Sequence, residues 1–195
     1  MRVRTPSASP TVVALYRLIQ LLMLAVVAAI LTWAMILQYA FGEIPCPLCL
    51  LQRVAMLGCC FGLIVQLREE GPERTERGTG IALLFALLLL VISARQVLLD
   101  IVPRPGHDYI GQPVFGLHMP VWSVLIAVAL LGGVAIRLVL FGAPRAQAGA
   151  RDSAFRRPAR GLEIYVLAIA AINFLSVVLQ CGLGECHTFG YRLLQ

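Results

Sequence analysis

Long apolar segments are the feature that most constrains this chain of 195 residues. A helix needs about 20 consecutive apolar residues to cross a bilayer, and five segments approach or exceed that length. We expect membrane-spanning helices at residues 11–38, 48–67, 79–99, 120–141 and 162–179. The composition agrees, because 59% hydrophobic and 13% charged residues are atypical of a soluble domain. The sequence therefore predicts an all-α protein that crosses a membrane several times.

Arginine carries all the positive charge, because the chain has no lysine and its formal net charge is +6. In a soluble chain this balance could indicate nucleic-acid binding. The enrichment of arginine in cytoplasmic loops of membrane proteins explains it more simply, so we expect no nucleic-acid partner. Arginines concentrate in three segments that we therefore expect to be cytoplasmic: residues 1–10, 68–77 and 142–160. Three other segments then face outward: residues 39–47, 101–119 and 180–195.

Cysteines form two pairs on the expected outward side, Cys46 with Cys49 and Cys181 with Cys186. Thiols outside the cytosol can form disulfides, and two pairs on one face can exchange electrons if packing brings them together. Two glycines between Cys181 and Cys186 favour a tight loop that brings the sulfurs close. A static disulfide and a mobile shuttle pair are both compatible with this tail.

The first pair lies at the expected start of the second helix, within Pro45-Cys46-Pro47-Leu48-Cys49. Free backbone N–H groups and the helix dipole favour a thiolate at such a position, and Cys49 is the better placed cysteine. Arg53 follows one turn later on the same face, where it can stabilise a thiolate or a reduced oxygen anion. Redox activity, a zinc site that uses both pairs and a structural disulfide remain open. The cation beside Cys49 argues against metal.

Other polar residues have less specific interpretations. Arg95 and Gln96 lie near the end of the third span, where an arginine either extends to the interface or marks a binding site. Cys59 and Cys60 lie inside the second span and are assigned no chemistry. The histidines are interpreted as solvated loop residues, although one could carry protons for a quinone: His107, His118 and His187.

Two motifs carry a resemblance to a known family. Residues 44–53 read Ile-Pro-Cys-Pro-Leu-Cys-Leu-Leu-Gln-Arg and resemble the first outward loop of the DsbB family, quinone-coupled disulfide-generating proteins of bacterial inner membranes. Residues 115–122 read Phe-Gly-Leu-His-Met-Pro-Val-Trp and are similar to the family's Gly-Leu-x-Met-Pro-x-Trp entry to its fourth helix. The resemblance covers residues 11–141 and implies a four-helix transmembrane bundle.

The resemblance also implies roles for the first pair. Cys46–Cys49 would be the disulfide next to the quinone, which is ubiquinone or menaquinone. Cys49 would attack the quinone or form a charge-transfer complex with it, and Arg53 would promote this step. Arg95 and Gln96 would lie near the quinone. Cys46 would exchange with a second cysteine pair, which in the family oxidises a periplasmic thioredoxin-fold thiol oxidase of the DsbA type.

The chain departs from the family pattern in its second pair and in its third helix. Residues 101–119, where the family carries its second pair, contain no cysteine, and Arg95-Gln96 replaces an Arg-His pair that many members have. We infer that a fifth span delivers Cys181 and Cys186 to the outward side in place of the missing pair.

We therefore expect three parts: a DsbB-like four-helix domain at residues 1–141, a cytoplasmic basic linker at 142–160, and a fifth transmembrane helix with an outward tail at 161–195. The expected function is that of an inner-membrane thiol:quinone oxidoreductase with a cytoplasmic amino terminus and a periplasmic carboxy terminus. The alternatives are a membrane thiol reductase that works in the reverse direction and a Cys/His metal-binding assembly subunit.

Overall fold

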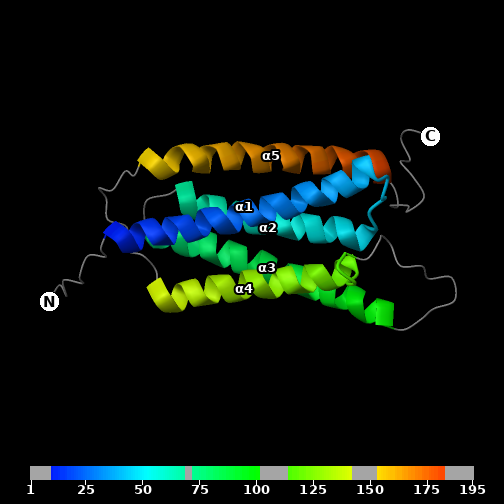
Figure 1. Cartoon of the computed structure of the whole chain (residues 1–195), viewed down its shortest axis with the longest axis horizontal. Coiled ribbons are helices and arrows are strands. Elements are labelled where there is room, and N and C mark those ends of the chain that lie inside the picture. Colours follow the sequence, from blue (N-terminus) through cyan, green and yellow to red (C-terminus); the bar gives the residue numbers. More distant parts are fainter. Residues whose placement is uncertain (1–9, 69–71, 102–113, 142–152, 183–195) are drawn as a thin grey trace.

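Five α-helices make up most of the computed structural model, which describes residues 10–68, 72–101, 114–141 and 153–182 (Figure 1). All five are long and apolar enough to cross a membrane. This confirms the predicted all-α, multi-pass fold. The helices are α1 (Pro10–Ala40), α2 (Pro47–Arg68), α3 (Pro72–Ile101), α4 (Met119–Phe141) and α5 (Ser153–Cys181).

Helices α2, α3 and α5 extend into polar sequence that we expected to lie between spans. The charged turn expected at residues 68–77 is wrong in extent, because α2 continues through Arg68 and α3 already begins at Pro72. Proline suits the first turn of a helix, where its missing N–H costs nothing. Likewise, α5 begins at Ser153, inside the expected basic linker, and contains Pro158 near its start. Apolar runs locate the part of a helix within the membrane but not its polar end turns.

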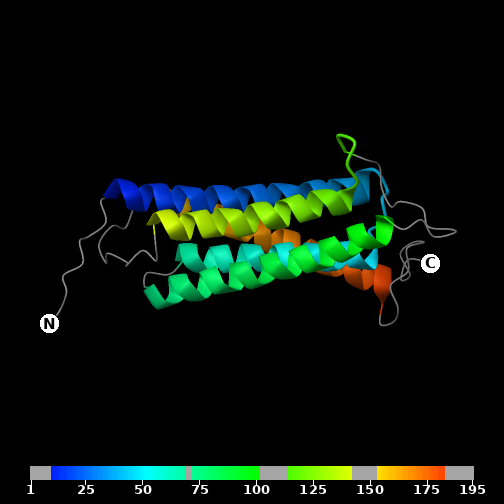
Figure 2. The same ribbon diagram turned by 90° about the horizontal axis from the view of Figure 1, so that it is seen from below.

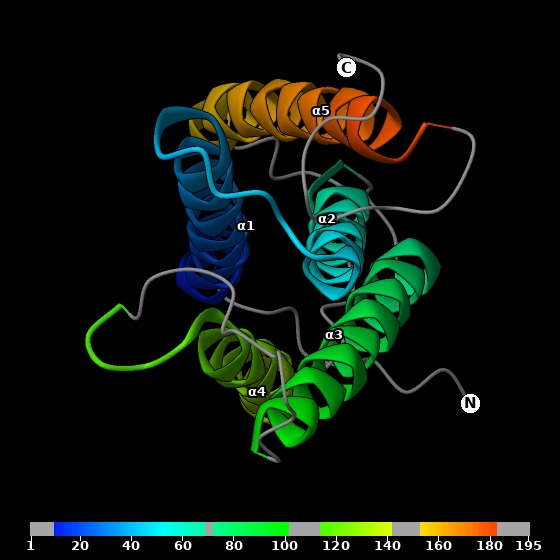
Figure 3. The same ribbon diagram turned by 90° about the vertical axis from the view of Figure 1, so that its right-hand side faces the viewer.

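The helices α1 to α4 form a bundle, and α5 packs outside it against α1 and α2 (Figure 3). All five run roughly along one long axis (Figure 2). An ion pair fixes the first part of α5, since Arg68 Nε lies 2.9 Å from Glu163 Oε1. The predicted four-helix bundle with an added fifth helix is confirmed, and α2 lies where it touches α1, α3 and α5.

Close backbone contact joins α2 to α3 at two glycines. A Cβ atom added to Gly62 would lie 2.5 Å from the backbone nitrogen of Ala82, and one added to Gly78 would lie 2.7 Å from the Gly62 carbonyl oxygen. Small residues allow such approach between helices in lipid, where van der Waals packing is a main source of association. The helix that begins beside the cysteine pair is therefore packed tightly onto α3.

A buried arginine joins four helices near the other end of the bundle. Arg137 of α4 is 2% exposed and donates to the hydroxyl oxygens of Tyr16 in α1 and Thr79 in α3, each at 2.8 Å. It also donates to Gln66 Oε1 in α2, and its guanidinium carbon lies 5.1 Å from the centre of the Tyr16 ring. Gln20 of α1 donates to the same Gln66 oxygen at 2.6 Å. This polar cluster fixes the spacing of α1 to α4 far from the cysteines.

Candidate redox site and adjoining cavity

Cys46 and Cys49 form a disulfide at the amino end of α2, with their Cα atoms 5.0 Å apart. Cys46 directly precedes the helix, and its Sγ accepts a hydrogen bond from the Cys49 backbone N–H at 3.0 Å. It therefore occupies the N-cap position, where a side chain satisfies an otherwise unpaired N–H group. Pro47 is the first helical residue, which its fixed φ favours. The local sequence thus builds the turn that holds both sulfurs at a helix start.

Arg53 lies one turn after Cys49 and is 8% exposed. Its guanidinium is held by α1: it donates to the Ala34 carbonyl oxygen at 3.0 Å, contacts Met35 Sδ at 3.4 Å and donates to Gln38 Oε1. A buried charge requires such hydrogen bonds. The expected neighbour of Cys49 is therefore fixed in place by a different helix.

Gln96 of α3 approaches both sulfurs of the disulfide. Its Nε2 lies 3.5 Å from Cys46 Sγ and 3.7 Å from Cys49 Sγ, both as a donor. Its Oε1 accepts from Gln52 Nε2 at 2.8 Å, and Gln52 Oε1 accepts from the Ser123 hydroxyl at 3.1 Å. A chain of neutral hydrogen bonds thus runs from α4 through α2 and α3 to the cysteine pair.

A cavity of about 580 Å³ adjoins the disulfide and is bounded by α1, α2 and α4. Cys49 and Arg53 both line it, in agreement with the helical spacing that places them on one face. Other polar residues of its lining come from four different segments: Gln38, Glu43, Gln52 and Ser123. The part of the cavity near Cys49 therefore offers both a cation and hydrogen-bonding groups.

The remainder of the cavity is lined mainly by apolar side chains. Val26 and Ile30 of α1 and Ile126 of α4 belong to this apolar lining. The lining residues of α1 run from Val26 to Gln38, about 18 Å along the helix at 1.5 Å per residue. A long molecule with a polar group at one end and an apolar chain at the other matches this distribution.

An aromatic turn forms part of the cavity wall. Trp122 Nε1 donates to the Val114 carbonyl oxygen at 3.0 Å, and the Phe115 ring packs edge-on against Trp122 with centroids 6.5 Å apart. Phe115 has a φ of 50°, an uncommon value for a residue other than glycine. All three residues line the cavity, so the turn forms part of its boundary.

The other residues singled out from the sequence lie in different places. Neither Arg95 nor Gln96 lines the cavity: the Arg95 side chain is exposed, whereas Gln96 beside it is buried and faces the sulfurs. Their expected role at the quinone stays a prediction. His118 precedes α4, where its carbonyl oxygen accepts from the N–H groups of Val121 and Trp122. Cys59 and Cys60 are buried free thiols within the core.

Within the described ranges, no three histidine, cysteine or carboxylate side chains gather as a metal ion would require. Three residues considered for metal or redox chemistry lie outside those ranges: His107, Cys186 and His187.

The carboxyl end of α5 reaches the cysteine pair. Gln180 is fully buried, and its Nε2 donates to the Pro45 carbonyl oxygen at 2.8 Å. Cys181, the next residue, is buried and disulfide-bonded. The fifth helix thus brings the first tail cysteine to the end of the bundle that carries Cys46.

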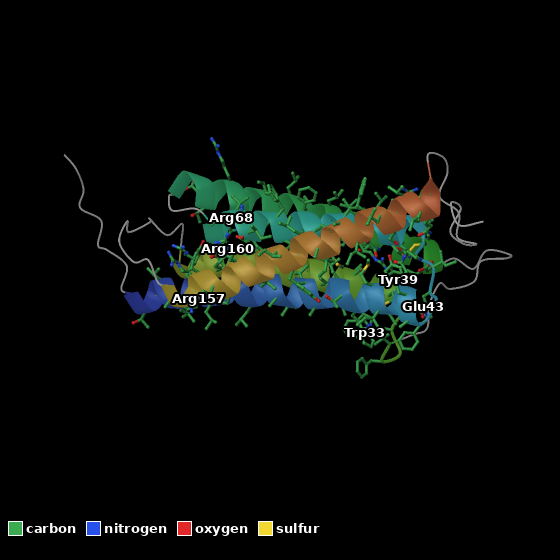
Figure 4. All side chains as sticks on the ribbon, turned by 90° about the horizontal axis from the view of Figure 1, so that it is seen from above. Trp33, Tyr39, Glu43, Arg68, Arg157 and Arg160 are labelled. Atoms are coloured by element: carbon green, nitrogen blue, oxygen red, sulfur yellow. A yellow bond between two sulfur atoms is a disulfide. The ribbon has the colours of Figure 1, made fainter. Side chains whose placement is uncertain are left out.

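Several arginines of the described chain mark the opposite end. In Figure 4, Arg68, Arg157 and Arg160 lie at one end of the molecule, while Tyr39 and Glu43 lie at the other, beside the disulfide. Arginine-rich and cysteine-bearing ends of the bundle are therefore separated by the full length of the helices. This is the separation that the sequence led us to expect.

Known proteins share the part of the chain that builds this site. The family model described as Disulfide bond formation protein DsbB matches residues 16–108, which include most of α1, all of α2 and all of α3. A protein named Disulfide bond formation protein B from Chromohalobacter salexigens is 34% identical over 117 residues, 55% of this chain and 63% of the relative. Over this part of its length the chain is similar to proteins of the DsbB family.

Other proteins of the same name have similar identity to this chain over stretches of similar length. A protein of the same name from Chromobacterium violaceum is 33% identical over 113 residues, 54% of this chain and 65% of the relative. One from Xylella fastidiosa is 29% identical over 138 residues, 53% of this chain and 79% of the relative. The chain thus spans slightly less than two thirds of the length of the first two relatives. No solved structure matches the chain.

Several residues around the DsbB-type pair were not identified as site residues from the sequence. Gln52 stands between Cys49 and Arg53 in the motif, but nothing in the motif indicates its link to Gln96. Gln38 and Gln180 carry a weak signal, because uncharged polar residues at the ends of apolar spans often pair inside a bundle. Their partners lie on other helices, so only the tertiary structure identifies the contacts.

Proposed function

We propose that this chain is a membrane thiol:quinone oxidoreductase that generates disulfides for proteins outside the cytosol. The observation that carries the proposal is that a Cys46–Cys49 disulfide, with Arg53 one turn away, opens onto a long cavity with a polar and an apolar part. A disulfide with only a stabilising role has no need of an adjacent cation and ligand cavity. Similarity to a disulfide-formation family supports the same conclusion.

A lipid-soluble quinone, ubiquinone or menaquinone, fits the residues of this cavity. Arg53 and Gln52 line the cavity with N–H donors for a ring with two carbonyl oxygens, and the apolar part suits an isoprenoid chain. A bound quinone accepts two electrons and two protons. These are the two electrons that a dithiol gives up when it becomes a disulfide.

The chain's own residues would act on sulfur and on charge. Cys49 lines the cavity and would be the thiolate that faces the quinone. Arg53 would stabilise negative charge on that thiolate and on the reduced ring, as preorganised cations do. Gln96, within hydrogen-bond range of both sulfurs, would hold the thiolate once the disulfide opens.

Electrons would reach this pair from the tail. A substrate dithiol would reduce a Cys181–Cys186 disulfide through a mixed disulfide, leaving two tail thiols. A tail thiolate would attack Cys46 and release Cys49 as a thiolate; the second tail thiol would then restore the tail disulfide and leave Cys46 and Cys49 reduced. The Gln180–Pro45 hydrogen bond supports this route, because each residue directly precedes a cysteine of a different pair.

We propose the bacterial inner membrane as the location, with the arginine-rich end cytoplasmic and the cysteine end periplasmic. The substrate of the tail would be a periplasmic thioredoxin-fold thiol oxidase of the DsbA type. A phosphatase reporter that is active only outside the cytosol, fused after Gln195, tests the orientation, and we expect it to be active. Activity of a second reporter that works only in the cytosol, fused at the same position, would contradict both the orientation and the route.

Trapped disulfides test the electron route. Mass spectrometry of the Cys49→Ala and Cys181→Ala variants should detect a link between Cys46 and a tail cysteine. Wild-type protein given a reduced DsbA-type partner should reduce ubiquinone, and the Cys46→Ala variant should develop a visible charge-transfer band with quinone. Thiol-to-disulfide turnover only in the opposite direction would favour a reductase. One equivalent of bound metal without quinone reduction would favour an assembly subunit.

A further inference from the structure

Gln38 connects the fifth helix to the guanidinium of Arg53. Its Oε1 accepts a hydrogen bond from Arg53 Nη1, and its Nε2 donates to Ser176 Oγ in α5 at 2.5 Å. Gln38 is 3% exposed and Ser176 is fully buried, so water does not compete for these groups. A buried path of two hydrogen bonds therefore runs from α5 to the cation beside Cys49.

We propose that Gln38 is a positioning residue through which α5 sets the orientation of Arg53 at the cavity. The proposal rests on the proposed function, since it assigns Arg53 a role toward Cys49 and the quinone. It gives α5 a second task besides carrying the tail cysteines. The fifth helix then belongs to the catalytic machinery of the four-helix part and is more than an attachment for the tail.

The two ends of an amide make Gln38 suitable for this task. The Ser176 hydroxyl oxygen accepts from Nε2, and this fixes which way the amide points and presents Oε1 to Arg53. A side chain with several rotatable bonds, such as Arg53, gains a defined position when its donors meet fixed acceptors. An amide oxygen does so without cancelling the guanidinium charge, whereas a carboxylate at this position would pair with it.

The chain offers a matched control on the same two helices. Thr32 of α1 and Tyr165 of α5 are joined by a 2.7 Å hydrogen bond between their hydroxyl groups, six residues before Gln38 in α1 and separate from the bonds that join Gln38 to Arg53 and Ser176. Loss of that more exposed bond also removes a side-chain link between α1 and α5. It leaves the path through Gln38 intact.

The test measures the reactivity of Cys49 in quinone-depleted, full-length protein that carries Cys46→Ala. Alkylation of the Cys49 peptide by iodoacetamide is followed by mass spectrometry at one pH in three variants: Gln38→Ala, Ser176→Ala and Thr32→Val. We expect about tenfold slower alkylation in Gln38→Ala, the loss typical of a hydrogen bond to a charged group. Ser176→Ala should show a smaller decrease in the same direction, and Thr32→Val should match the parent.

Kinetics in the Cys46-containing chain give a second readout. Gln38→Ala should raise KM for ubiquinone and lower kcat. Gln38→Glu still holds the guanidinium, but its carboxylate pairs with the guanidinium charge. This variant should therefore keep the thermal unfolding temperature of the wild type and still have a lower kcat. Wild-type alkylation rates in both folded Gln38→Ala and Ser176→Ala would overturn the proposal. If the wild-type chain, with Cys46 present, fails to reduce ubiquinone while the alkylation differences persist, the quinone activity is contradicted and the positioning role stands.

Discussion

Gln180 and Pro45 lie 135 positions apart in the sequence and are joined by a 2.8 Å hydrogen bond from the Gln180 amide to the Pro45 carbonyl oxygen. Pro45 precedes Cys46, and Gln180 precedes Cys181. The bond therefore joins the side chain just before the second cysteine pair to the backbone just before the first. The predictions below concern this junction, the cavity and the packing that supports them.

Removal of the junction should slow exchange between the two cysteine pairs. Gln180→Leu loses the bond to Pro45 and keeps a side chain of similar size, so we expect fewer links between Cys46 and the tail in trapping experiments. Direct reduction of Cys46–Cys49 by dithiothreitol should be unchanged. Equal yields of the inter-pair link in Gln180→Leu and wild type would show that the junction does not serve the exchange.

Replacement of Arg53 should slow quinone reduction strongly, whereas replacement of Arg95 should not. Arg53→Ala removes a cation from the cavity lining, and we expect about 100-fold slower quinone reduction, as for loss of a preorganised charge-stabilising group. Arg53→Lys should recover part of the rate, because ammonium cannot reproduce the fork that binds α1. Arg95→Ala should behave as wild type because its side chain is exposed. A large effect of Arg95→Ala would place the quinone elsewhere.

Gln96 should affect sulfur chemistry more than folding. Gln96→Leu removes the amide donor near both sulfurs, and we expect about threefold slower alkylation of Cys49 in the Cys46→Ala background, the effect of one modest hydrogen bond. Gln52→Leu, which leaves that donor in place but removes its support, should give an intermediate rate. The rates are read from the Cys49 peptide. Identical rates in all three proteins would remove Gln96 from the mechanism.

The contact between α2 and α3 should tolerate no side chain at Gly62. A Cβ there would meet the Ala82 backbone at 2.5 Å, so Gly62→Ala should lower the free energy of unfolding by about 1–3 kcal/mol, as overpacking does. Gly80→Ala is the control, because nothing lies within 4 Å of the added atom. It should be neutral or slightly stabilising, since alanine favours helix. Thermal unfolding in detergent compares the two variants.

The number of helices follows from the sequence, because apolar length alone determines it. The placement of Cys49 and Arg53 on one face follows from their spacing of four residues within one helix. The contacts of Gln38, Gln96 and Gln180 do not follow, because each joins helices far apart in the chain. The early starts of α3 at Pro72 and α5 at Ser153 were also missed, since polar end turns lack the apolar pattern.

The role of Arg137 is another feature that does not follow from the sequence. A lone arginine in the fourth apolar segment has no local signal that distinguishes a ligand site from a structural group. Its partners come from α1, α2 and α3, and together they satisfy a charge that lies inside the bundle. Only the packing of four helices shows that its role is to hold them.

The Gln180–Pro45 contact also determines how a reaction at this end of the molecule depends on concentration. Both residues belong to one polypeptide, so an encounter between Cys181 and Cys46 is unimolecular, with an effective concentration of about millimolar or more. Dilution in the membrane leaves such a step unaffected. A freely diffusing thiol that attacks Cys46 must compete with the locally concentrated Cys181 thiol.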